Sequence, residues 1–429
     1  MIDALGNPLS CAWPQAVRAY DQAIDCQLHG WLGALPALDQ ALRHDPAFAL
    51  AHAARALLLQ AQGRGAEARQ AIASALDRCT ASTTDRERAH IALLALVVEG
   101  RPAAALTAVV DHAGRWPTDA LALSTALGAF GLFAFSGRAD HDQARLSFIR
   151  RIAPHHGDHS AWLLTQLSWA HTEAGQPDVG LELVERSLAL RRANGNAAHV
   201  MAHARFERAE PLQALAFIDE WLTRYPFEGV LYGHLNWHAA LAEIELGLID
   251  AAVARLVDVI LPHLQHALPL IGLTDAASLL WRLGLQGRNG LSWAATQAYA
   301  EARYPQGGNV FVELHLAMLA AAQRDAAALA QCRARLQRQA DAGHAGAATA
   351  MLWVDGLQRL GGGDGVSAAS ARVAAQASAQ AAAQAAAKAA FDACIAQAAR
   401  LGGSHAQRTI IQHTRTAMFL PGANRQPSP

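Results

Sequence analysis

The chain has 429 residues, of which 52% are hydrophobic and 17% are charged, and its 35 basic and 36 acidic residues leave a formal net charge of -1. A balance so close to zero gives no reason to expect nucleic acid or an anionic membrane as a partner. No apolar run approaches the roughly 18 residues of a membrane-spanning helix, and the N-terminus lacks the pattern of a secretory signal. The five cysteines are scattered, with no metal or redox spacing, so we expect a cytoplasmic protein without membrane contact.

Alanine-rich segments with the spacing of a helical repeat begin the chain. Two Ala-Leu helix ends, at 41–42 and 75–76, are 34 residues apart, and Asp45-Pro46 follows the first of them. This is the pattern of tetratricopeptide repeats (TPRs), whose helical pairs must stack because neither helix can bury its apolar side alone. We therefore predict an all-α fold, a TPR-like α-solenoid in which antiparallel helical pairs form a right-handed superhelix.

Glycine and proline divide the rest of the chain into further helical pairs. The predicted pairs are 86–100 with 102–115, 119–135 with 140–152, 160–174 with 178–191, 196–208 with 211–224, 231–246 with 249–266, 271–286 with 291–303, and 309–322 with 325–342. The composition divides the chain into a superhelix over 1–360, a Gly/Ala-rich hinge and low-complexity helix over 361–390, and C-terminal capping helices of the same superhelix over 391–420.

Two His-x-x-x-His pairs, His199/His203 and His234/His238, lie in stretches that predict helices. A spacing of four residues places both imidazoles of a pair on one helical face. The second members of the two pairs are 35 residues apart, about one repeat, so both pairs should face the same side. Polar residues continue this recurrence on the helices predicted to line the concave face, namely Glu173, Asp275 and His315.

Such a set has two chemical uses. Neutral imidazoles and a carboxylate are ligands for zinc, iron or manganese. The predicted ligands are His199, His203, His234, His238, Asp275 and His315. Alternatively, His203 and His238 could act as general acid and base with Asp275 orienting a tautomer. Glu173 and Trp237 would then contact the bound ligand, although core packing is an alternative for Trp237, and Glu207 could reach the site one turn beyond His203. A third histidine group, at 155–159, precedes a helix and is predicted to lie on the surface.

Several segments in order, HVMAHARFE, GHLNWHAALAEIELG, LTDAASLLWRL, VFVELHLAM and LGGSHAQR, resemble the tetratricopeptide repeat protein 38 family. The resemblance runs from about residue 10 to about residue 415. It implies an all-helical TPR-like superhelix, and it carries over the four paired histidines with Trp237, Asp275, His315, Gln407 and Arg408 as motif positions. It implies no settled activity. Glu207 is one position out of register with the family's acidic residue, and the alanine-rich stretch near 366–390 departs from the family pattern.

The Gly-Gly-Ser turn at 402–404 suggests a further ligand contact. Backbone N–H groups at the start of a helix, with Gln407 and Arg408, could bind a carboxylate or another anion. The alternative is that Ser404 caps the helix while Arg408 forms an internal ion pair.

The sequence thus predicts a helical-repeat protein with a histidine-rich site for a small molecule on its concave face. The site would serve a metal-dependent or acid/base enzyme, a hydrolase or an oxygenase acting on a small metabolite. The alternative is a non-catalytic TPR scaffold that binds a peptide or protein partner in its groove. The final apolar helix, IIQHTRTAMFL, could cap the solenoid or form a homodimer contact.

Overall fold

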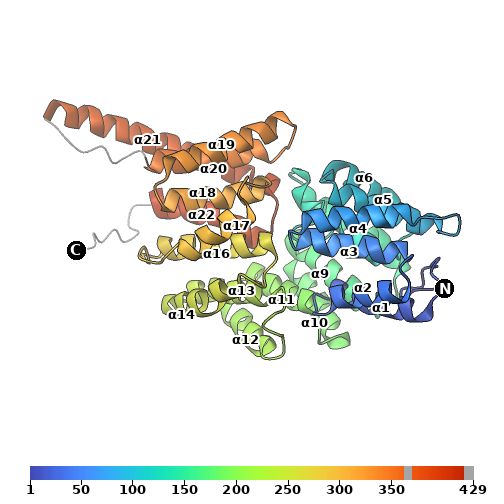
Figure 1. The fold of residues 1–429 in the computed structure, drawn as a ribbon. Helices are drawn as coiled ribbons and strands as arrows, with labels where there is room; N and C mark the ends of the chain where they lie inside the picture. The colour runs from blue at the N-terminus through green and yellow to red at the C-terminus, as the bar shows by residue number, and fades with distance from the viewer. Residues whose placement is uncertain (362–369, 420–429) are drawn as a thin grey trace.

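The computed structural model describes residues 1–361 and 370–419, and these residues fold as a succession of helices without a strand ladder (Figure 1). A single isolated antiparallel bridge joins Ile2 and Pro8. The helices are α1 (Pro14–Leu28), α2 (Ala34–His44), α3 (Ala49–Ala61), α4 (Gly65–Asp77), α5 (Asp85–Val98), α6 (Pro102–Arg115), α7 (Ala120–Ser124), η1 (Ala134–Ser136), α8 (His141–Ile152), η2 (Ala153–His155), α9 (Ala161–Glu173), α10 (Pro177–Leu190), α11 (Gly195–Glu207), α12 (Pro211–Leu222), α13 (Tyr232–Glu245), α14 (Ile249–Arg255), η3 (Leu256–Ile260), α15 (Leu261–His263), α16 (Pro269–Leu285), α17 (Ala294–Arg303), α18 (Val310–Ala322), α19 (Ala326–Asp341), α20 (Ala347–Gly361), α21 (Ser370–Ala396), η4 (Ala398–Leu401) and α22 (His405–Phe419).

Helix starts follow from local chemistry. Proline occupies the first turn of α6, α10 and α12, where its missing N–H costs nothing. Where no proline is present, side chains often cap the helix. Thr84 and Glu87 form a reciprocal capping box at α5, and Ser160, Asn194 and Asn309 accept N–H bonds at α9, α11 and α18.

Consecutive helices pack as pairs, and neighbouring pairs stack along the chain. Small residues allow the close approach within a pair: a Cβ on Gly180 of α10 would lie 2.0 Å from Oγ1 of Thr172 in α9. Alanine is the commonest buried residue of the first core, which extends from α1 into α9. The predicted α-solenoid of TPR-like helical pairs is confirmed.

The predicted helix over 119–135 is wrong. Only α7 forms there, and an irregular segment runs from residue 125 to α8, interrupted by η1. Glycines explain the break, because Gly128 and Gly137 have positive φ values of 79° and 71°, which other residues rarely adopt. A Cβ on Gly131 would lie 2.1 Å from the carbonyl oxygen of Leu127.

The last helix does not simply extend the stack. α22 packs against α16 and α11, two inner helices far earlier in the chain (Figure 1). Arg282 of α16 donates to the carbonyl oxygen of Ala406, at 2.9 Å, and the indole N–H of Trp281 donates to Thr414, at 2.8 Å. η4 likewise contacts η1. The C-terminal helix therefore covers part of the face that the inner helices of the middle repeats present.

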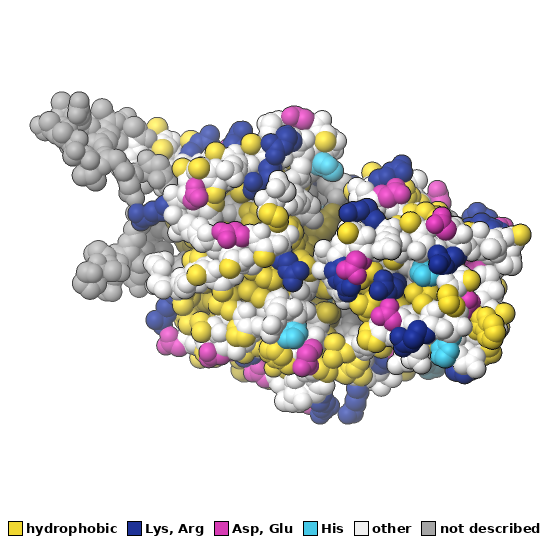
Figure 2. All heavy atoms as spheres, viewed as in Figure 1, with side chains coloured by type: hydrophobic (Ala, Val, Ile, Leu, Met, Phe, Trp, Pro, Cys, Tyr) yellow, Lys and Arg dark blue, Asp and Glu magenta, His cyan; other side chains and the backbone are white. Residues whose placement is uncertain are grey.

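Acidic and basic side chains are interspersed on the face seen in Figure 2, without a large field of one sign. Among residues 1–361 and 370–419, no helix combines the length and apolarity needed to span a bilayer.

Most of the predicted glycine-rich hinge, residues 362–365, lies outside the described residues, and α21 runs on through residue 390 to Ala396. The division of the chain at 361 and 390 stays a prediction.

Candidate metal centre

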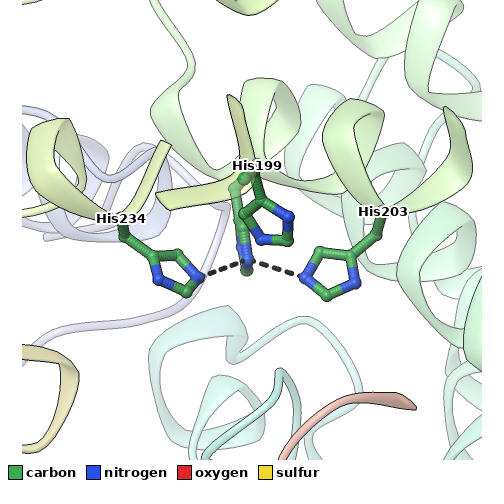
Figure 3. Close-up of side chains that lie close together, drawn as sticks. His199, His203 and His234 are labelled. Atoms are coloured by element: carbon green, nitrogen blue, oxygen red, sulfur yellow. Dashed lines mark hydrogen bonds between the residues drawn. The ribbon is translucent and has the colours of Figure 1, made fainter. Parts of the chain in front are cut away.

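Four imidazoles converge where α11 and α13 meet. His199 and His203 lie one turn apart on α11, and His234 and His238 lie one turn apart on α13. One ring nitrogen of each lies within 4.8 Å of the corresponding nitrogens of the other three. Nε2 of His199 is central, 2.9 Å from Nε2 of His203 and 3.0 Å from Nε2 of His234 (Figure 3). The two histidine pairs converge in the structure, as predicted.

Two of the four rings have a carboxylate at Nδ1, on the side that faces away from the other imidazoles. Nδ1 of His203 lies 3.2 Å from Oε1 of Glu173 on α9, and Nδ1 of His234 lies 2.9 Å from Oδ2 of Asp275 on α16. All four side chains are buried. Nδ1 of His234 is hydrogen-bonded to Asp275, whereas Nδ1 of His203 lies at ion-pair distance from Glu173 without hydrogen-bond geometry. A negative charge at Nδ1 favours the tautomer with its hydrogen on that nitrogen, so Nε2 of both rings carries a lone pair directed inward.

These tautomers leave too few hydrogens at the centre. Nε2 of His199 faces the lone pairs of two other Nε2 atoms, yet it can carry only one hydrogen and donate to only one of them. Nε2 of His238 is buried without a hydrogen-bond partner among the described residues. Nitrogen lone pairs crowded in this way repel each other, whereas a cation among them would satisfy all of them.

The protonation of the site suits a cation. Burial lowers the pKa of His199 and of His238 well below the usual value, and the neighbouring imidazoles lower it further. Burial would raise the pKa of Glu173, but His203, Arg408 and Arg145 outweigh it and hold that pKa at about 2. Burial raises the pKa of Asp275, against the opposing effect of His234. The imidazoles of His199 and His238 are therefore neutral at physiological pH, as a ligand of a cation must be.

Aromatic rings and guanidinium groups surround the imidazoles in two similar sets. Trp169 stacks on His199 with ring centroids 5.6 Å apart, and Trp237 stacks on His234 at 5.5 Å. Arg145 and Arg282 lie over the two indoles, each 5.5 Å from the ring centroid. Trp237 also donates to Ser278 and is fully buried, so it packs against the centre through its ring. These walls limit the rotation of the imidazoles.

α22 holds the carboxylate behind His203. The backbone N–H of His405, at the first position of that helix, donates to Oε2 of Glu173 at 2.9 Å. The side chain of His405 contacts Glu207, which raises the pKa of His405. Glu207 is therefore paired with His405, and it does not contact the four imidazoles, which its position on the helix would have allowed it to reach.

Three other predicted site residues lie apart from the four imidazoles. His315 is buried on α18, where Nδ1 lies 2.8 Å from the carbonyl oxygen of Phe311. α18 is two inner helices beyond α13, and helix axes pack about 8–10 Å apart, so its side chain falls short of the cluster. Gln407 and Ser404 form a reciprocal cap at the start of α22. Arg408 lies 3.6 Å from Asp142. The structure therefore has the helix cap and the internal ion pair that the sequence offered as the alternative to an anion site.

Asp275 is also not one of the four converging groups, since it contacts His234 from behind. The histidines at 155–159 mostly lie on the surface as predicted: His155 and His159 are exposed. His156 is half-buried and lies 2.9 Å from the carbonyl oxygen of Pro117.

Sequence reasoning missed a second buried polar cluster. The carboxylate of Asp119 lies 2.8 Å from Arg86 and 3.0 Å from both His90 and His112. Its signal was weak: Arg86 and His90 are four residues apart in RERAH, but nothing in the sequence connects them with Asp119. Opposing the effect of burial, these neighbours hold the pKa of Asp119 well below its usual value.

Comparison with known proteins adds little to this geometry. No protein-family model matches the chain. The crystal structure of the P58(IPK) TPR domain is similar to it, with 14% sequence identity over 81% of this chain and 89% of that one, at a TM-score of 0.23. A superposition of that quality carries no argument, so the assignment to TPR-like repeats rests on the helical pairs themselves.

Proposed function

We propose that this helical-repeat protein binds one divalent metal ion through His199, His203, His234 and His238, and that the metal serves a reaction of a small metabolite. The observation that carries the proposal is the convergence of four imidazole nitrogens within 4.8 Å, with too few hydrogens to satisfy them. Carboxylates behind two of the ligands are the usual support of metal-bound histidines. A set of imidazole nitrogens suits zinc or iron better than manganese, which prefers oxygen ligands.

The identity of the metal bears on the type of reaction. Zinc with four protein ligands is coordinatively closed, which is typical of structural sites. Iron takes additional ligands, and open positions beside histidines serve oxygen-dependent chemistry. Hydrolysis at zinc would require one imidazole to give way. His199 is the candidate, since it is partly exposed and no carboxylate is bonded to it among the described residues.

The residues of the chain have separate tasks in this proposal. Glu173 and Asp275 keep the hydrogens of His203 and His234 on Nδ1, and the indoles of Trp169 and Trp237 fix the ring planes and exclude water. Of the four imidazole side chains, only that of His199 is partly exposed.

A peptide-binding scaffold remains the alternative function, but the geometry favours it less. Such a scaffold needs an open groove along its inner helices, and α22 covers α16 and α11 in this protein. Arg282 and Trp281 on this face of α16 are bonded to α22 rather than free for a partner.

Two further assignments belong to the same proposal. The residues through which the chain resembles the tetratricopeptide repeat protein 38 family include the four converging histidines, which supports membership of that family. A cytoplasmic location is supported by the five free cysteines, as expected of a reducing compartment. Fractionation of cells that produce the chain would test the location.

Metal content tests the proposal. Elemental mass spectrometry of untagged protein should find about one equivalent of zinc or iron per chain, as expected for one four-ligand site. The variant His203→Ala/His238→Ala should lose it. The control His155→Ala/His159→Ala removes two exposed histidines and should retain it. Protein that holds no metal, even after incubation with zinc or with iron(II), would favour the scaffold.

A further inference from the structure

A cavity of about 390 Å³ lies far along the chain from the four imidazoles, between α1, the start of α9 and the end of α10. The N-terminal turn at 3–5 closes one side of it. Its apolar walls include Leu5, Ile24, Leu121 and Trp162. Cavities that bind small molecules commonly measure about 300–1,000 Å³ and are mostly apolar with a few polar groups.

Aspartates outnumber the basic groups that line this cavity, which are Arg191, His29 and His159. Four aspartates contribute to the lining, Asp3, Asp21, Asp25 and Asp119. Two of them are neutralised by the protein: Asp25 lies 2.6 Å from Arg191, and Asp119 lies 2.8 Å from Arg86. For Asp3 and Asp21, no arginine, lysine or histidine of the described residues lies within ion-pair distance.

Asp21 is the less satisfied of these two. Asp3 accepts from the backbone N–H groups of Leu5 and Asn7 and from the Asn7 amide, whereas Asp21 accepts one hydrogen bond from the described residues, from the N–H of Ala4 at 3.0 Å. Burial raises the pKa of Asp21, and the carboxylate of Asp3 adds to that effect. The ionised carboxylate of Asp21 is therefore held at a cost that a cation in the cavity would relieve.

A second polar group of the cavity is also without a partner. Tyr20 lines it and is only 3% exposed, yet its hydroxyl forms no hydrogen bond with the described part of the chain. The hydroxyl is accessible from the cavity, so a group bound there can supply the partner that the chain does not. Tyr20 and Asp21 are adjacent in α1, so an acceptor and a carboxylate border the same space.

We propose that this cavity binds a small organic amine, with its ammonium group at Asp21 and Tyr20 and its apolar part against Leu5, Ile24 and Trp162. An ammonium group supplies the donors and the positive charge that these two side chains lack. An anion would be repelled by the aspartates, and a neutral alcohol would leave the charge of Asp21 uncompensated. The site is independent of the metal centre.

Isothermal titration calorimetry with three probes of similar shape tests this proposal. We expect 2-phenylethylamine to bind. Because a hydrogen bond to a charged group contributes about 1.5–3 kcal/mol, 2-phenylethanol should bind at least about tenfold more weakly. We expect 3-phenylpropionate not to bind, because the aspartates repel its carboxylate. Asp21→Asn should lose the preference for the amine, and Tyr20→Phe should weaken amine binding. The control Asp77→Asn removes an exposed carboxylate far from the cavity and should change nothing.

Circular dichroism would first establish that each variant is folded, and Asp21→Asn should fold because it removes a charge that burial disfavours. Equal affinity for the amine and the alcohol would overturn the proposal, as would full amine affinity in Asp21→Asn. So would the failure of wild-type protein to bind any of the three probes at millimolar concentration.

Discussion

Four imidazoles and two carboxylates meet where α9, α11, α13 and α16 lie side by side, and the carboxylates determine which nitrogen of a ring faces inward. Glu173 and Asp275 lie at Nδ1 of His203 and His234, so Nε2 of each ring is left with a free lone pair. Sequence spacing predicted the two histidine pairs but could not separate ligands from supporting residues. The repeat spacing of these residues shows which face of a helix each one occupies, but it does not show how far each one lies from the centre of the site.

The supporting carboxylates should affect metal affinity without being ligands. Glu173→Gln and Asp275→Asn each remove the charge behind one ligand, and loss of such a partner typically lowers metal affinity about 10–100-fold. Competition with a chelator of known affinity would measure this. Glu313→Gln is the matched control, since it also removes the charge of a buried carboxylate but lies on α18, where it pairs with Arg335. Unchanged affinity in both test variants would mean that the carboxylates do not support the site.

The metal-free protein should lose stability as pH falls. The folded-state pKa values of His199 and His238 lie well below 6.5, so below pH 6.5 the unfolded chain binds protons that the folded chain does not. Each of these two histidines can contribute up to about 1.4 kcal/mol per pH unit in that range. Denaturant unfolding of chelator-treated protein at pH 7.5, 6 and 5 should therefore give a shallower dependence for His199→Gln/His238→Gln than for wild type. Equal slopes would show that neither ring resists protonation.

Helices and their breaks differ in how well the sequence predicts them. Prolines in first turns and glycines after helix ends marked most boundaries, because each acts through its own backbone. The segment after α7 was predicted helical because it is apolar and alanine-rich, yet Gly128 and Gly137 adopt positive φ there. A glycine in a sequence does not reveal whether it stands inside a helix, as Gly180 does, or ends one.

Two glycines within helices should respond to alanine in opposite ways. A Cβ on Gly180 of α10 would lie 2.0 Å from Oγ1 of Thr172 and 3.1 Å from the carbonyl oxygen of Ser168, so Gly180→Ala should cost about 1–3 kcal/mol of overpacking. A Cβ on Gly114 of α6 would meet nothing within 4 Å, so Gly114→Ala should stabilise by up to about 1 kcal/mol. Urea unfolding of the two variants beside wild type measures both. A neutral Gly180→Ala would contradict the close packing of α9 on α10.

In the whole molecule, the C-terminal helix is joined to the middle of the chain beside the four imidazoles. The contact between His405 and Glu173 spans 232 residues of sequence, and no local pattern could have predicted it. The stacking of pairs was predictable because it repeats between neighbours, whereas this contact occurs once. The same limit explains why most of the cluster around Asp119 was missed, since its arginine and one of its two histidines lie 33 and 29 residues away, although the other histidine lies 7 residues away.

The central claim is that four imidazoles of two adjacent repeats bind one metal ion, and X-ray absorption at the metal edge tests it most directly. For protein loaded with one equivalent of zinc, we predict a first shell of nitrogen atoms at about 2.0–2.1 Å, with the multiple scattering of imidazole rings and no sulfur. The spectrum should change in His203→Ala/His238→Ala. A first shell with sulfur at about 2.3 Å, or one made mainly of oxygen, would place the metal elsewhere and contradict the claim.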